Sequence, residues 1–130
     1  MRPCAASAAV QAFCQFATMN PIAFIHMIVG FLVIALSVPL VKRKVKMNPW
    51  YGIRIPEAFK FEERWFEINQ YGGRVTVWWG ISIVIVAAIG LMLPRNYWII
   101  YSFGALGIIL AGLGLVVTLI IRYAAKTKRN

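Results

Sequence analysis

The sequence lacks the residue combinations on which most enzyme active sites depend. Its 130 residues include no aspartate, and the acidic side chains are Glu57, Glu62, Glu63 and Glu67. The only histidine, His26, lies in a distant apolar part of the chain. A Ser–His–acid triad, a metal cluster or a phosphate-binding loop therefore cannot form within one copy. The glutamates suit a solvated helix face better than paired acid–base chemistry, so we expect no enzymatic activity and no metal or cofactor.

Cysteine is also scarce, and its spacing matches no metal or redox motif. Cys4 and Cys14 both lie in residues 1–20, an alanine-rich extension that differs from the rest of the chain. Three readings of this extension stay open: a weak signal peptide, a helix lying along the outer membrane surface, or an upstream addition with Met19 rather than Met1 as the natural start. We favour the last of these and assign the extension no function.

Charge is absent from three long apolar runs, at residues 21–41, 75–93 and 98–121. Hydrophobic residues make up 61% of the chain, and the mean hydropathy is +0.72. About 20 apolar residues span a hydrocarbon core, where the backbone must satisfy its own hydrogen bonds. Three buried soluble helices would leave too little polar chain to cover them. The sequence therefore predicts an all-α integral membrane protein with three transmembrane helices, residues 21–130 forming one membrane domain.

The net charge of +10 is unevenly distributed along the chain. Of the 14 lysines and arginines, only Arg2 and Arg95 lie outside residues 42–74 and the tail after residue 121. Basic residues favour cytoplasmic segments, so we expect residues 42–74 and the C-terminus inside, and the N-terminus outside. The cations would contact anionic lipid headgroups, at about 1 kcal/mol each. Direct nucleic-acid binding is a weaker reading.

Small residues recur at helical spacing within the three runs. In the third run they are Gly104, Gly107, Ala111 and Gly114. In the second they are Gly80, Ala87 and Gly90, and in the first Ala23, His26, Gly30 and Ser37 share one face. Such faces let membrane helices approach closely. We interpret them as packing surfaces, either within a three-helix bundle or between copies in a homo-oligomer.

His26 is a candidate site, because an ionisable side chain inside a membrane span is often functional. Two readings stay open. The imidazole can be neutral and hydrogen-bonded to a neighbouring span, or it can serve as an intramembrane site that senses a ligand or couples to protons.

Residues 42–74 join the first two runs. They include the stretch "NPWYGIRIPEAFKFEERWFEINQYGGR", residues 48–74. A continuous helix is broken by Pro49, Gly52 and Pro56. Helical spacing then relates Ala58, Phe61, Trp65 and Ile68, and Gly72–Gly73 reads as a helix stop. We therefore predict a cytoplasmic hairpin over residues 42–74 with an amphipathic helix in the membrane interface. Its aromatic face can dock on the spans, which we favour, or the helix can be a linker that floats on lipid.

The same segment resembles the signature of the SdpI family of bacterial membrane proteins. The matching positions are Tyr51, Gly52, Arg54, Pro56, Trp65, Asn69, Gly72 and Gly73. The resemblance covers residues 22–122 and has the flanking spans in the expected places. Ile55 departs from the family's usual threonine, which can cap a following helix where isoleucine cannot. Longer members have further spans upstream, so this chain resembles a short form.

The resemblance implies a protein of the bacterial cytoplasmic membrane. The member that gives the family its name protects its producer against a secreted peptide toxin and draws a DNA-binding repressor to the membrane. The expected partners are therefore a peptide toxin, a cytoplasmic repressor and membrane lipids. The alternative is a small oligomeric transporter or export subunit, which would need polar groups near the membrane midplane, where this chain has few.

Two motif residues allow a structural reading of the hairpin. Arg54 can contact lipid phosphate, cap helix carbonyls or pair with Glu57 or Glu62, and we favour a structural role. Asn69 can hydrogen-bond backbone groups that the proline and glycine breaks leave free. On this reading, the motif determines how the hairpin folds against the spans.

Overall fold

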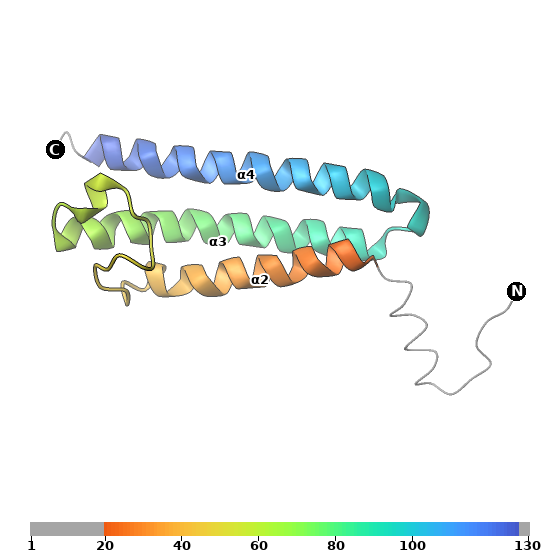
Figure 1. Ribbon diagram of the computed structural model, residues 1–130, viewed down its shortest axis with the longest axis horizontal. Helices are drawn as coiled ribbons and strands as arrows, with labels where there is room; N and C mark the ends of the chain where they lie inside the picture. The colour runs from red at the N-terminus through yellow and green to blue at the C-terminus, as the bar shows by residue number, and fades with distance from the viewer. Residues whose placement is uncertain (1–19, 128–130) are drawn as a thin grey trace, which may run out of the picture.

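The computed structural model describes residues 20–127 as three long helices and two short 3₁₀ turns. The helices are α2 (Pro21–Val41), α3 (Glu62–Met92) and α4 (Trp98–Thr127), and the turns are η1 (Pro56–Phe59) and η2 (Arg95–Tyr97). α3 lies between α2 and α4 and runs antiparallel to both (Figure 1). All three are long and apolar enough to cross a membrane, which confirms the three predicted spans. The expected extension, with Cys4 and Cys14, lies outside the described residues except for Asn20.

Both ends of α2 are defined by local chemistry. At its start the Asn20 side chain accepts hydrogen bonds from the backbone N–H groups of Ile22 (3.1 Å) and Ala23 (3.4 Å). These two groups have no partner within the helix, so the cap stabilises the first turn. Pro39 lies inside the last turn, and the helix ends two residues later. The proline therefore does not break the helix.

Arg43 closes α2 in a backbone conformation that usually belongs to glycine. Its φ is 53°, and the N–H of the next residue, Lys44, donates to the Pro39 carbonyl at 3.0 Å. A non-glycine residue in this conformation costs on the order of 1 kcal/mol. The Arg43 side chain offsets this cost by reaching α3, where it donates to Gln70 Oε1 (3.1 Å) and to Glu63 Oε1 (3.4 Å). The residue at which the chain leaves α2 is therefore bonded to α3.

Glycine lets α2 and α3 approach closely near their middles. A Cβ added to Gly30 would lie 2.7 Å from Val84 Cγ2, and one added to Gly80 would lie 2.7 Å from Ile34 Cγ1. Ala23, Ser37 and Ala87 are buried on the same helices. Because the hydrophobic effect does not join helices within lipid, such close contact supplies the dispersion energy that holds them together.

α4 packs on the bundle at its two ends. The last part of α4 buries Val116, Ile120 and Ala124 in a cluster with Trp65 and Ile68 of α3. Near the opposite end, Tyr101 and Ala105 pack with Ala23 of α2. We call the first of these the hairpin end and the second, next to η2, the turn end. Between the two clusters α3 and α4 separate and leave a groove.

The predicted small-residue face of α4 does not pack within the bundle. A Cβ on Gly104, Gly107 or Gly114 would find nothing within 4 Å, and Ala111 is exposed. The reading of this stripe as an internal packing surface is therefore wrong. The face that packs is the one carrying Val116 and Ile120, which are buried in a cluster with side chains of α3. Contact between copies through the stripe stays a prediction.

The prediction of a separate amphipathic helix that stops at Gly72–Gly73 is also wrong. The chain is extended at Phe61, and α3 then continues through both glycines for 31 residues. A Cβ on Gly73 would lie 3.1 Å from Leu40 Cβ, and one on Gly72 would lie 3.2 Å from the Ile120 side chain. Neighbours on two sides need this space, and their packing outweighs the weak helix preference of glycine, about 1 kcal/mol per residue.

The unequal lengths of the helices leave room for the hairpin. α2 has 21 residues and is roughly 31 Å long at about 1.5 Å per residue, which matches a hydrocarbon core of about 30 Å. α3 and α4 have 31 and 30 residues, so each is roughly 45 Å long. Their extra length projects beyond α2 at the hairpin end, and residues 42–61 fold into the space beside it (Figure 1).

We expect Gly80→Leu to destabilise the bundle by about 1–3 kcal/mol, because the added side chain overpacks the α2–α3 contact. Reversible unfolding in mixed micelles, followed by circular dichroism, measures the change. Gly107→Leu is the matched control, since nothing lies within 4 Å of its Cβ. Equal loss of stability in the two variants would contradict the packing described here.

Candidate functional site

The motif residues meet at the hairpin end around one asparagine. Asn69 is 2% exposed, and its Oδ1 accepts a hydrogen bond from the Ile53 N–H at 2.6 Å. Its Nδ2 donates to the carbonyl of Trp65, one turn earlier in α3, at 2.9 Å. The carboxamide therefore satisfies a loop N–H and is itself held by the helix. The oxygen attaches the loop to α3, and the nitrogen fixes the orientation of the carboxamide.

Trp65 forms the apolar centre of the same unit. Its side chain is fully buried, and the indole Nε1–H donates to the carbonyl of Val45 at 2.8 Å. The ring packs against Phe59 of η1, with centroids 5.1 Å apart. One side chain therefore contacts the loop both before and after its central turn. Ala58, also fully buried, completes the contact on the η1 side.

Gly52 belongs to the unit for two separate reasons. Its φ of 119° is a conformation that other residues rarely adopt. A Cβ there would also lie 2.6 Å from Asn69 Oδ1 and 3.0 Å from Trp65 Cζ2. The glycine, the tryptophan and the asparagine of the motif are thus in mutual contact, although 17 positions separate Gly52 from Asn69 in the numbering (69 − 52).

The remaining motif residues stabilise the loop itself. An Arg54 Nη1–H donates to the Pro49 carbonyl, and the Tyr51 hydroxyl donates to the Leu36 carbonyl of α2. Of the roles considered for Arg54, the structure shows a hydrogen bond to a backbone carbonyl. That carbonyl belongs to the loop and not to a helix. Pro56 opens η1, which has no side-chain cap at Ile55.

Asn48 organises the turn and was missed in the sequence. Its Oδ1 accepts from the N–H groups of Trp50 (2.9 Å) and Tyr51 (2.7 Å), and its Nδ2 donates to the Lys46 carbonyl (2.7 Å). An asparagine before a proline is a typical turn residue, because its side chain bonds the backbone two residues on. The dipeptide Asn48–Pro49 was therefore a usable signal.

Arg64 is a second residue that the sequence did not single out. It is 6% exposed; its Nη2 donates to the Ala124 carbonyl of α4 at 3.2 Å, and its Nη1 lies 3.6 Å from Glu67 Oε2. Nearby, the rings of Tyr71 and Tyr123 stack with centroids 4.0 Å apart. These contacts join the projecting ends of α3 and α4.

The outer surface of this unit is aromatic and basic. Trp50 is 88% exposed, and Phe61 is 56% exposed. The same segment carries the exposed cations Lys44, Lys46, Arg54 and Lys60, and the exposed Glu62 and Glu63 follow Phe61. A rigid surface of this kind suits a membrane headgroup layer or an acidic partner surface.

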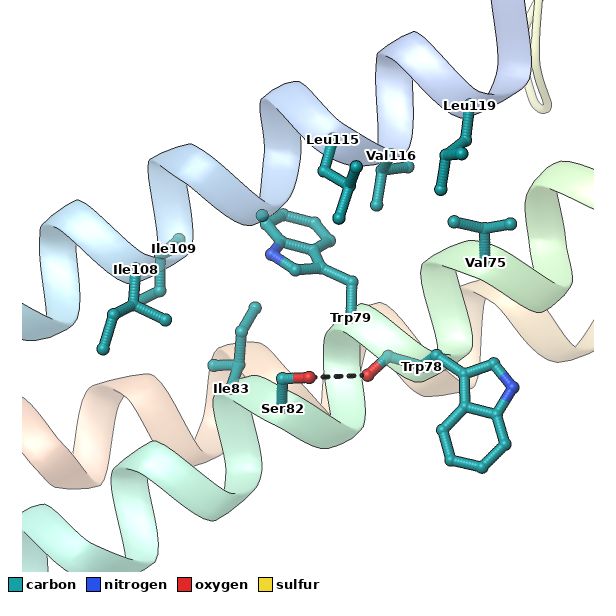
Figure 2. Close-up of a pocket in the computed structure, with 11 residues that line it drawn as sticks. Val75, Trp78, Trp79, Ser82, Ile83, Ile108, Ile109, Leu115, Val116 and Leu119 are labelled. Atoms are coloured by element: carbon teal, nitrogen blue, oxygen red, sulfur yellow. Dashed lines mark hydrogen bonds between the residues drawn. The ribbon is translucent and has the colours of Figure 1, made fainter. Parts of the chain in front are cut away.

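A groove runs between α3 and α4 beside the hairpin end (Figure 2). Its volume is about 460 Å³, and its lining is apolar apart from Ser82, whose hydroxyl donates to the Trp78 carbonyl at 3.0 Å. Trp79 points across it toward α4, and Trp78 points away. A Cβ on Gly112 would lie 2.5 Å from Trp79 Nε1, so the indole lies on the glycine. The groove can accept an apolar group from the lipid phase.

Hydroxyl groups in the helices do not form a polar path. Each donates to the carbonyl four residues earlier in its own helix: Ser37, Thr76, Ser82, Ser102 and Thr118. Bonded in this way, they offer no donor to a passing solute. Within residues 20–127, no three histidine, cysteine or acidic side chains come close enough to hold a metal ion.

His26 meets α4 at the turn end. Its Nδ1 lies 3.1 Å from the Tyr101 hydroxyl oxygen, within hydrogen-bonding distance, and the two ring centroids are 6.0 Å apart. This is the contact that the first reading of His26 anticipates. It joins the first and third spans directly, far from the motif residues.

These features define a small multi-pass helical membrane protein whose motif builds a hydrogen-bonded hairpin at one end of the bundle. The chain belongs to the SdpI/YfhL protein family, whose sequence profile matches residues 44–123. The match confirms the resemblance seen in the sequence, and it includes every motif residue of the hairpin. No curated protein matches the chain, and no solved structure does.

We expect Asn69→Ala to loosen the hairpin, because it leaves the half-buried Ile53 N–H without its acceptor, a loss of about 1 kcal/mol. Limited trypsin cleavage in the hairpin, at Lys46 or Arg54, should become about tenfold faster. Asn96→Ala, at an exposed asparagine of η2, is the matched control and should cleave at the wild-type rate. Wild-type cleavage in Asn69→Ala would show that its bonds do not hold the hairpin.

A double-mutant cycle of His26→Ala and Tyr101→Phe should give a coupling energy of about 0.5–1.5 kcal/mol, because each change removes the same interhelical hydrogen bond. Unfolding in mixed micelles measures it. Additive effects of the two substitutions would contradict a shared bond.

Proposed function

We propose that this protein is a membrane immunity protein that binds a membrane-active peptide toxin and signals to a cytoplasmic regulator. The observation that carries the proposal is the convergence of Gly52, Trp65 and Asn69 on one rigid unit at the end of the bundle. A motif whose residues build an end surface, and not a path between helices, favours recognition over transport. The family's namesake, which the motif resembles, has both of these roles.

The groove between α3 and α4 is the proposed site for the toxin. It opens along the side of the bundle and is almost wholly apolar, so a peptide already dissolved in the bilayer can insert side chains into it. Its indole and branched aliphatic walls favour bulky apolar groups. Sequestering the peptide on a single protein would prevent it from assembling into a membrane-disrupting form.

The proposed route from groove to hairpin is a shared packing cluster. Val116 lines the groove and is also buried against Trp65 and Ile68, and Trp79 packs against the same cluster. An occupant that moved α4 away from α3 would therefore disturb the residues that hold the hairpin. The groove and the hairpin are therefore linked through one shared side chain, Val116.

The proposed location is the bacterial cytoplasmic membrane, with the hairpin end inside. The support is the distribution of basic residues, since eight of the 14 lie in residues 42–74 and four follow residue 121. The exposed aromatic and basic surface then faces the cytoplasm, where a soluble DNA-binding repressor would meet it. An oligomeric transporter stays the alternative, but it would need polar groups that the helix hydroxyls do not supply.

The immunity role is tested in the source bacterium by deleting the gene. The cells are placed in spent medium of the parent strain, and depolarisation of their cytoplasmic membrane is measured. We expect the deletion strain to depolarise and the wild-type gene to restore protection. Ile108→Trp should reduce that protection about tenfold, because it fills the groove. Ile99→Trp, on an exposed part of the same helix outside the groove, is the matched control. No difference between deletion and parent strains would overturn the immunity role.

The signalling role is tested separately with photo-crosslinking side chains at Trp50 and Phe61 in native membranes. We expect toxin-dependent capture of a DNA-binding protein, lost in Asn69→Ala and absent with the probe at Asn96. Capture that is unchanged by Asn69→Ala would contradict recognition by the hairpin.

A further inference from the structure

A second groove lies between α2 and α3 on the hairpin side of the bundle. It has a volume of about 340 Å³ and separates into two chemical parts. Its polar part consists of Lys42 and Arg74. Its apolar part is lined by Val38, Val41, Val77, Trp78 and Ile81. A groove with cations at one end and hydrocarbon along its floor differs from the wholly apolar groove between α3 and α4.

Both cations lack a counter-charge from the protein. Lys42 and Arg74 are exposed, and within residues 20–127 neither side chain has a hydrogen bond or ion pair to the chain. Their neighbours are engaged: Arg43 pairs with Glu63, and Arg64 pairs with Glu67. The acidic residues of these pairs are therefore already committed. The two free cations attract an anion from outside the protein.

Position along the helices places these cations at headgroup depth. Lys42 follows the last residue of α2, the helix whose length matches the hydrocarbon core. Arg74 lies in α3 just beyond Gly73, which contacts the end of α2, so both cations lie at one level. Trp78 is 71% exposed and one turn deeper, as expected for an interfacial aromatic residue. Ile81 and Val38 extend the floor toward the membrane interior.

We propose that this groove binds one anionic phospholipid. Its phosphate lies between Lys42 and Arg74, and one acyl chain follows Val38, Val77 and Ile81 beside Trp78. The order of charge and hydrocarbon along the groove matches that of the lipid. This is a discrete, saturable site, unlike the diffuse attraction that the net charge predicts. Because Lys42 directly precedes Arg43, the bound lipid stabilises the point where the hairpin leaves α2.

The test is native mass spectrometry of the full chain in uncharged detergent, with dioleoyl phosphatidylglycerol or dioleoyl phosphatidylcholine added. We expect one saturable adduct with the anionic lipid, bound about tenfold more tightly than the zwitterionic one. The pair Lys42→Gln/Arg74→Gln should lose this preference, while Lys42→Arg/Arg74→Lys keeps it. Arg122→Gln/Lys126→Gln on α4 removes the same charge elsewhere and should bind as the wild type does.

The apolar half of the groove is tested without a change of charge. Ile81→Trp should weaken binding of the anionic lipid, while Ile89→Trp, on an exposed part of α3 outside the groove, should not. The comparison uses the two variants only if circular dichroism shows that each has the helix content of the wild type. Glycerol 3-phosphate should not displace the lipid, because it lacks the acyl chain.

Three results would overturn the proposal. If Lys42→Gln/Arg74→Gln and Arg122→Gln/Lys126→Gln lose the preference for the anionic lipid equally, the attraction is diffuse. Displacement by glycerol 3-phosphate would indicate a site for soluble phosphate. A change from dimer to monomer in Ile81→Trp, with lipid binding intact, would make the groove an interface between copies.

Discussion

The hydrogen bond from the Ile53 N–H to Asn69 Oδ1 attaches the hairpin to α3, and the rest of the hairpin end depends on it. The second bond of the carboxamide, to the Trp65 carbonyl of the same helix, fixes its orientation, and Gly52 then lies against Trp65. With Trp65 covered by the loop, its indole N–H can reach the Val45 carbonyl, and the first part of the loop is held as well. A single buried side chain with both a donor and an acceptor thus organises a segment that has little regular structure.

The bundle uses two kinds of helix contact, and the difference has functional consequences. α2 and α3 touch through glycine, and this pair forms a tight, continuous unit. α3 and α4 pack through clusters near their two ends and, between these, through Trp79, which lies on Gly112. The glycine contact itself leaves no room for a ligand between α2 and α3, so their groove lies toward the hairpin end, beyond that contact, whereas α3 and α4 leave a larger apolar groove between them. Any movement of the bundle is therefore expected to be movement of α4 relative to the α2–α3 pair.

Much of this architecture could be predicted from local sequence, because lipid imposes simple rules. An uncharged run such as residues 75–93 has few alternatives to a membrane helix, and Pro94 with the residues after it marks a short turn. The motif positions could also be named, because unlike residue types recur at fixed spacing. What could not be predicted was their contacts: Trp65 and Asn69 share a helix face, but nothing in the sequence pairs them with Gly52 or Val45. Such contacts depend on how the loop folds back over α3.

The sequence by itself determined the number of spans, the concentration of positive charge at one end and the family. These follow from composition and from residue order, which act over one helix at a time. Only the tertiary structure decided the role of each glycine. Gly72 and Gly73 look like a helix stop, yet they lie inside α3, and Gly107 looks like a packing residue, yet its space is open. A glycine removes a side chain, and whether that absence ends a helix or admits a neighbour depends on what approaches it. Here Leu40 and Ile120 approach the first pair, and no described residue approaches the last.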